Sequence, residues 1–129
     1  MNVTRIVLFK ESSQFDLVRG PKKMSGKAPR NLKFSFGLSV TEGKPWPNEF
    51  MIRMELRTED MPAEEEPLLV TELHYAVSFD EPEANNAPLD IIWPLARPDL
   101  VAQLRRYEIP GDTIPLRLGA EGVDGKKSR

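Results

Sequence analysis

Residues 32–40 read LKFSFGLSV, a stretch in which large apolar side chains alternate with small or polar ones. Neighbouring side chains of an extended strand point to opposite faces, so this alternation predicts a strand with one buried face and one exposed face. The buried face would carry Leu32, Phe34, Phe36, Leu38 and Val40. A sheet that is covered on one side is therefore the expected basis of the fold.

Three other stretches alternate in the same way. Residues 50–57 read FMIRMELR and follow a loop, Thr41 to Asn48, that is interrupted by a glycine and two prolines. Residues 68–79 read LLVTELHYAVSF, and residues 3–18 form an earlier strand in which Ser12-Ser13 marks an expected bulge. Because these strands follow one another without an intervening helix, they predict an antiparallel meander.

The periodicity becomes helical after the fourth strand. Leu100, Val101 and Leu104 recur at helical spacing, which predicts a short helix around Arg97 to Tyr107. A proline inside a helix removes one backbone hydrogen bond, so the helix is expected either to begin at Pro98 or to be kinked there. The predicted fold class is α+β, a four-stranded antiparallel sheet (meander) followed by one short helix packed on it.

The length and composition fit one compact domain. The chain has 129 residues, of which 40% are hydrophobic, enough for one ordinary core. We place this domain at residues 1–118. Residues 119–129 are rich in glycine and basic side chains and nearly free of apolar ones, so they are expected to form a flexible tail.

Charge and residue usage argue against several classes of protein. A formal net charge of −2 gives no broad attraction for nucleic acid or for an anionic membrane surface. The absence of cysteine excludes disulfides and thiolate chemistry. No apolar run is long enough to cross a membrane, and the first residues do not resemble a secretion signal, so a cytoplasmic location is expected.

Three segments, in order along the chain, resemble the SecB family of protein-export chaperones. Val3-Thr4-Arg5-Ile6, with Lys10-Glu11 after it, is similar to the first strand of that family. Residues 91–97, IIWPLAR, are similar to its NILFPYAR segment, and residues 109–115 echo the proline-bearing run that follows its helix. The resemblance implies a homo-oligomer, a dimer or tetramer, that holds unfolded client polypeptides in apolar grooves and performs no catalysis.

The resemblance also suggests which residues contact clients. Phenylalanine and methionine suit clients of many sequences, because apolar contact is non-directional and thioethers adapt their shape. The candidate client-binding residues are Phe34, Phe36, Phe50, Met51, Met54 and Trp93. A phenylalanine stripe at strand spacing is equally typical of a core, and that interpretation remains open for each.

In the SecB family, acidic residues on the exposed sheet dock the export motor SecA. The matching positions here are Glu11, Asp16 and Glu72, with Val70 as an apolar contact. Each acid is equally consistent with a plain solvated carboxylate. The family continues into a second helix and an acidic or apolar tail, whereas this chain turns basic from Gly119, which leaves the coupling to SecA in question.

Other interpretations stay open. A dedicated chaperone for one client, such as an antitoxin, and a structural component of a phage or other assembly both fit the same pattern. An enzyme is the fourth alternative, since Glu72 and His74 share a strand face, but no nucleophile, phosphate loop or metal-ligand spacing accompanies them. We therefore expect no catalytic residue, no metal and no cofactor.

Two charged loops stand out. One is basic and spans residues 19–30, and the other is acidic and spans residues 59–66. Interleaved glycine and proline predict a mobile loop for the first, and a solvated turn is the simplest interpretation of the second.

Overall fold

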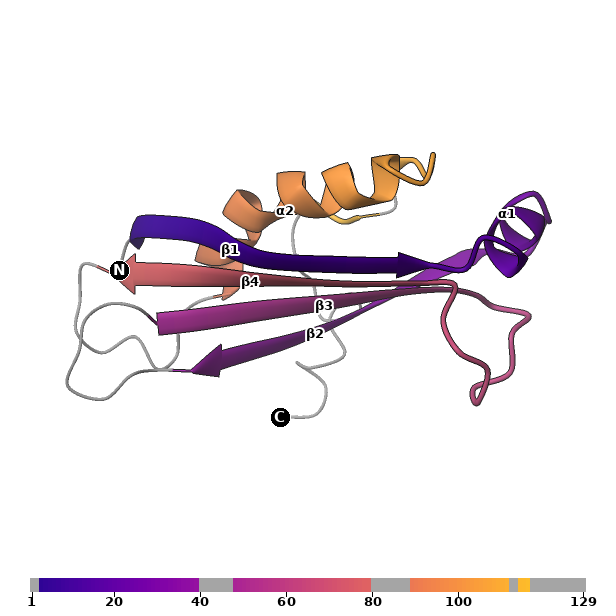
Figure 1. Cartoon of the computed structure of the whole chain (residues 1–129), viewed down its shortest axis with the longest axis horizontal. Coiled ribbons are helices and arrows are strands. Elements are labelled where there is room, and N and C mark those ends of the chain that lie inside the picture. Colours follow the sequence, from indigo (N-terminus) through magenta and orange to yellow (C-terminus); the bar gives the residue numbers. More distant parts are fainter. Residues whose placement is uncertain (1–2, 40–47, 80–88, 112–113, 117–129) are drawn as a thin grey trace.

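The computed structural model describes residues 3–39, 48–79, 89–111 and 114–116 of the chain (Figure 1). The elements within these ranges are β1 (Val3–Phe15), α1 (Arg19–Met24), β2 (Arg30–Ser39), β3 (Asn48–Thr58), β4 (Leu69–Phe79) and α2 (Leu89–Arg105). The expected loop at residues 41–47 and the tail at residues 119–129 lie outside the described residues.

The four strands form one antiparallel sheet in the order β1-β4-β3-β2, and α2 packs on it, which confirms the predicted fold class (Figure 1). The meander itself extends only over β2, β3 and β4. Strand β1 lies beside β4, so residues 16–29 carry the chain across one end of the sheet, from the edge formed by β1 to the edge formed by β2. Short α1 lies in this crossover, where the sequence predicted only a mobile loop.

Strand β1 ends earlier than expected, at Phe15. The bulge predicted at Ser12-Ser13 is not there, because pairing with β4 is regular from Lys10 to Phe15 and the register shifts between Leu8 and Lys10 instead. One extra residue at this point exchanges the two faces of the strand, so that Leu8 and Phe15 pack against the same core. The alternation of apolar residues predicted a register shift somewhere between Leu8 and Phe15 but did not give its position.

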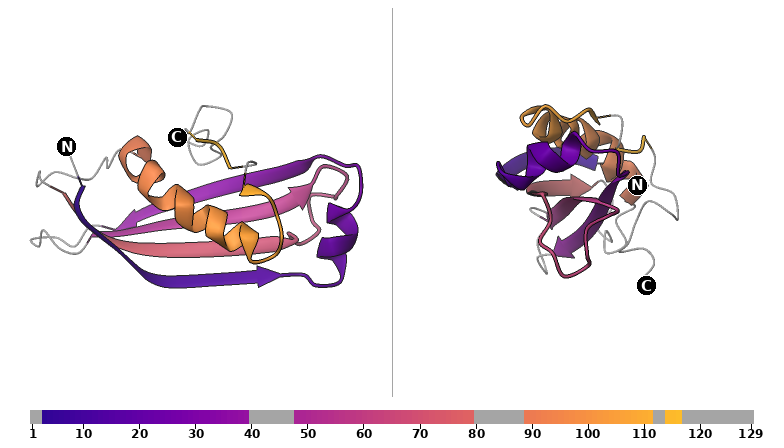
Figure 2. Two further views of the ribbon diagram at one scale, coloured as in Figure 1. Left: turned by 90° about the horizontal axis from the view of Figure 1, so that it is seen from above. Right: turned by 90° about the vertical axis from the view of Figure 1, so that its right-hand side faces the viewer.

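Helix α2 begins eight residues before the predicted start, at Leu89, and contains both Pro94 and Pro98. The two prolines are exposed, so the carbonyl groups that lose their helical partners lie on the face of the helix directed to water. The opposite face carries the contacts with the sheet. Seen from above, α2 lies obliquely across the strands (Figure 2).

The core lies between α2 and one face of the sheet. Strands β3 and β4 contribute every second side chain, and β1 and β2 add further apolar contacts. The helix contributes five side chains that are almost fully buried: Ile92, Trp93, Ala96, Leu100 and Leu104. The other face of the sheet is not covered by any described element, and its β3 and β4 side chains, which alternate with the core residues, are only half-buried. One face of the sheet is thus packed against α2, and the other is partly exposed to solvent.

Candidate functional site

Four of the six predicted client-binding residues lie in the core. Phe34, Phe50, Met54 and Trp93 are each no more than 3% exposed. Trp93 meets Phe34 edge-on, with 5.2 Å between ring centroids, and its indole Nε1 donates a hydrogen bond to the carbonyl oxygen of Pro115 at 3.0 Å. In a single subunit these side chains hold α2 on the sheet and offer no surface to another chain.

The remaining two predicted client-binding residues are half-buried and lie on opposite faces of the sheet. Phe36 sits on the covered face of edge strand β2, against Phe50 and Trp93. Met51 lies on the uncovered face, opposite His74 and Gly37. The structure therefore does not bring the six candidates together into one groove.

A hollow of about 390 Å³ lies instead at the end of the sheet, where β1 ends and the crossover begins. Its apolar walls come from the end of β1, from α1 and from the segment after α2. The lining residues are Phe15, Leu17, Pro21, Met24, Arg30, Arg106, Tyr107, Glu108 and Ile109. We call this site the apolar hollow.

The floor of the apolar hollow is an aromatic stack. Phe15 and Tyr107 pack nearly parallel, with 4.8 Å between ring centroids and 26° between planes. Gly20 lies directly against the Phe15 ring, since a Cβ atom at Gly20 would stand 2.4 Å from the ring. Glycine is required here because only a residue without a side chain lets α1 approach the ring so closely.

Asp16 and Arg19 fix the turn that joins β1 to α1. Asp16 Oδ1 accepts hydrogen bonds from the backbone N–H groups of Val18 at 3.0 Å and Arg19 at 2.8 Å, and Oδ2 accepts one from Arg19 Nε at 2.8 Å. The backbone N–H of Arg19, followed by its guanidinium, holds the pKa of Asp16 below its ordinary value. A carboxylate in this position thus orders the crossover.

Leu17 and Val18 project from this turn into water, 77% and 83% exposed. Alternation predicts that Leu17 belongs to the first strand, but β1 ends before it. Leu17 belongs to the wall of the apolar hollow, and Val18 is the next residue in the chain. Large apolar side chains exposed beside an apolar hollow are typical of an interaction site.

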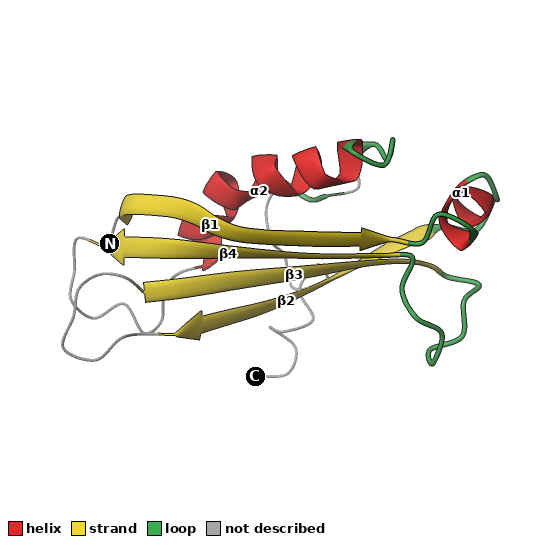
Figure 3. Ribbon diagram, viewed as in Figure 1, coloured by secondary structure: helices red, strands yellow, loops and turns green. Residues whose placement is uncertain are grey.

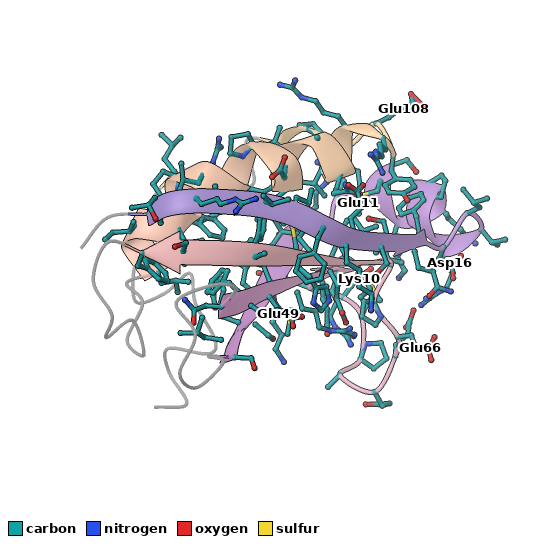
Figure 4. The ribbon with its side chains drawn as sticks, turned by 60° about the vertical axis from the view of Figure 1, so that its left-hand side comes forward. Lys10, Glu11, Asp16, Glu49, Glu66 and Glu108 are labelled. Atoms are coloured by element: carbon teal, nitrogen blue, oxygen red, sulfur yellow. The ribbon has the colours of Figure 1, made fainter. Side chains whose placement is uncertain are left out.

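The predicted partner-binding residues do not share one surface. Glu11 faces α2, where its carboxylate accepts a hydrogen bond from Gln103 Nε2 at 3.0 Å and pairs with Arg106 at 3.1 Å. Val70 and Glu72 point to the uncovered face of the sheet. Figure 4 shows Glu11 on the helix side of β1, Lys10 on the other side, and Asp16 beside α1.

The pair that motivated the enzyme alternative sits in a network of charges on the uncovered face. His74 lies between two carboxylates, with Nδ1 3.0 Å from Glu49 Oε1 and Nε2 3.2 Å from Glu72 Oε1. Glu72 also accepts a hydrogen bond from Arg53 Nη1 at 2.8 Å, and His74 and Arg53 together lower its pKa. These side chains do not line the apolar hollow, and no nucleophilic side chain hydrogen-bonds to His74 among the described residues.

A second cavity, also of about 390 Å³, borders the other side of α1. It is lined by Arg19, Lys22, Lys23, Gly26, Lys27, Ala28 and Asp60. Four cations and one carboxylate make it positively charged. We call it the basic cavity.

The basic crossover and the acidic turn between β3 and β4 lie at the same end of the sheet (Figure 3). Two ion pairs join them, Lys23 Nζ to Asp60 Oδ2 at 3.3 Å and Arg19 Nη1 to Glu65 Oε2. The two charged loops of the sequence are thus partners of each other. Among the cations around α1, Lys22, Lys27 and Arg30 form no ion pair with any described residue.

The sequence matches no protein-family model and no curated protein. Among solved structures, the chain is similar to the Mycobacterium tuberculosis SecB-like chaperone Rv1957, solved in complex with a ChAD peptide from the HigA1 antitoxin Rv1956. The two chains are 12% identical, with a TM-score of 0.57, and the match covers 92% of this chain and 87% of that one. This likeness establishes a SecB-like fold.

None of the described helices combines the length and apolar character needed to span a membrane. In the same part of the chain, no group of three or more histidine, aspartate or glutamate side chains is arranged to hold a metal ion.

Proposed function

We propose that this protein is a chaperone that binds non-native polypeptide segments in the apolar hollow, without catalysis. The observation that carries the proposal is the exposure of Leu17 at the wall of a hollow that Phe15 and Tyr107 also line, with the exposed Val18 next to it in the chain. The SecB-like fold supports it, and the similar Rv1957 chaperone is described in complex with a peptide. The predicted chaperone domain, residues 1–118, contains every residue of the hollow.

The hollow has a size suited to a few apolar side chains of an extended segment. Burying one leucine or phenylalanine side chain contributes about 1.5–3 kcal/mol, so one anchor alone gives weak binding. A client must therefore supply several apolar contacts, and Val18 together with the half-buried Phe36 are further candidates for them. Contacts of this kind depend little on the sequence of the client.

Suppression of aggregation tests this proposal. The purified protein is mixed with a model client diluted from denaturant, and light scattering is followed. We expect the wild type to reduce scattering and the Leu17→Ser/Val18→Ser double variant to lose most of that effect. Leu116→Ser is the control, because Leu116 is as exposed as Leu17, at 75% against 77%, and lines neither cavity. Scattering that the wild type leaves unchanged would refute the proposal.

A dedicated chaperone for one client is the second candidate. It is favoured by the description of the fold neighbour, which was solved with a peptide from an antitoxin. A general chaperone would protect several clients of unrelated sequence in the scattering assay. A dedicated one would protect only its own partner, so a panel of clients separates the two functions.

Assembly with further copies of the chain is part of the proposal. Strand β1 is an edge strand, and its Val7 and Phe9 are 42% and 53% exposed. An edge of this length offers unpaired backbone groups to a second chain. Sedimentation of the purified protein measures the assembly, and a monomer at all concentrations would contradict it.

Docking of SecA, and with it a role in protein export, remains a prediction. Val70 and Glu72 are the better-placed candidates, because both point to the uncovered face of the sheet. Glu11 and Asp16 are engaged in internal contacts. A Val70→Asp variant that still binds client and binds SecA as the wild type does would refute a role for this face.

A further inference from the structure

The two cavities share α1 as a common wall. Pro21 and Met24 face the apolar hollow, whereas Lys22, Lys23 and Gly26 line the basic cavity. A segment that anchors an apolar side chain in the first cavity therefore passes close to the second. An apolar site and a cationic site are offered to the same ligand.

The cations of the basic cavity are only partly neutralised. Arg19 is paired with Asp16 and Glu65, and Lys23 with Asp60. Lys22 and Lys27 have no carboxylate partner among the described residues. Glu59, Glu64 and Glu66 of the acidic turn line neither cavity. The unpaired charge facing the cavity is thus positive, although the whole chain carries a net charge of −2.

The rim of the apolar hollow has a similar bias. Arg30 is exposed there and forms no ion pair with a described residue. Arg106 is paired with Glu11 but keeps 58% of its side chain exposed. Glu108 is the one acidic residue in the lining. A carboxylate next to an apolar anchor would meet cations on both sides of α1.

From this charge complementarity we propose that the preferred ligand is an extended polypeptide segment in which an apolar residue is accompanied by acidic residues, with Lys22 and Lys27 as specificity-determining residues. The inference rests on the proposed peptide-binding function and names the chemistry of its ligand. Lys22 and Lys27 would thus add to the positive bias that Arg30 gives to the rim of the apolar hollow.

The geometry also sets a spacing. A helix with its side chains is about 10 Å wide, and an extended chain advances about 3.3 Å per residue. The acidic residue should therefore stand about three residues from the apolar anchor. A shorter spacing would leave the carboxylate over α1 itself.

The test uses fluorescent peptides that differ only in charge. One peptide carries a phenylalanine anchor with two aspartates about three residues away. The matched peptide has asparagines in place of the aspartates. Fluorescence anisotropy gives the Kd of each for the full-length protein, at low and at high salt. Exposed ion pairs are individually weak, so we expect the acidic peptide to bind roughly threefold to tenfold more tightly at low salt.

Two charge variants locate the effect. In Lys22→Gln/Lys27→Gln most of the preference for the acidic peptide should be lost, while the Kd of the neutral peptide stays the same. The control, Lys10→Gln/Lys33→Gln, removes the same charge from the uncovered face of the sheet and should keep the preference. High salt should weaken the preference in the wild type, because it screens exposed charges.

The outcomes distinguish the preference for acidic peptides from peptide binding itself. Equal affinity of wild type for both peptides, with loss of both in Leu17→Ser, would refute the charge preference and leave peptide binding intact. Failure of both peptides to bind would refute both. If Leu17→Ser instead changed the sedimenting mass and left peptide affinity unaltered, the hollow would be an interface between copies, and the inference would be wrong.

Discussion

Gly20→Ala is the substitution that most directly tests how the apolar hollow is built. The new Cβ would stand 2.4 and 2.7 Å from two Phe15 ring carbons, far inside van der Waals contact. A shift of the ring would also disturb its stack with Tyr107, whose ring centroid lies 4.8 Å away. Overpacking of this kind costs typically about 1–3 kcal/mol. Moving either the ring or α1 also distorts the hollow, so peptide affinity should fall together with stability.

Urea unfolding followed by circular dichroism measures the first effect. With a denaturant slope of about 2 kcal/mol/M, the expected loss lowers the midpoint by about 0.5–1.5 M. Gly37→Ala is the matched control, because a Cβ there meets only the Met51 methyl group at an ordinary 3.6 Å. Alanine in the strand should leave the midpoint equal or slightly higher. A Gly20→Ala variant that unfolds at the same urea concentration as the wild type would refute the described packing of α1.

Three further predictions concern stability. Trp93→Ala should lower the free energy of unfolding by about 3–5 kcal/mol, because it empties a core site and removes the hydrogen bond to Pro115. Thermal unfolding measures this loss, and a loss smaller than about 1 kcal/mol would place Trp93 outside the core. Glu108 follows α2 with a φ of 62°, so Glu108→Gly should stabilise the protein by on the order of 1 kcal/mol in urea unfolding, and any destabilisation would argue against that backbone geometry. The pKa of Asp16 is lowered in the folded state, chiefly by the backbone N–H of Arg19, so its contribution is present above the unfolded pKa of about 3.9 and is lost as the pH falls through the folded value. Asp16→Asn should therefore lower the urea midpoint more at neutral pH than in acid, where the carboxyl becomes protonated in both states, whereas an equal effect at both pH values would contradict a role for the charge.

The sequence by itself determined the sheet, because the signal for a strand is local. Alternation of side chains between two faces fixed β2, β3 and β4 to within a few residues and assigned Phe34 and Met54 to the face that is now the core. Helical spacing located the C-terminal half of α2. The first half was missed because Pro94 and Pro98 predict a break, and only the structure places both prolines on the exposed face.

The site was decided by contacts between residues that are far apart in the sequence. Alternation gives no information on which strand β1 pairs with, so the crossover and α1 were not anticipated. The hollow forms because that crossover brings Leu17 and Met24 to Tyr107, more than 80 residues later in the chain. Alternation placed Leu17 and Val18 in the first strand, so their apolar character gave no separate local signal for the hollow. The ion pairs were also decided by tertiary contacts. The sequence shows a basic loop and an acidic turn, but only the tertiary structure pairs Arg19 and Lys23 with acidic residues of that turn. It leaves Lys22 and Lys27 without an ion-pair partner among the described residues.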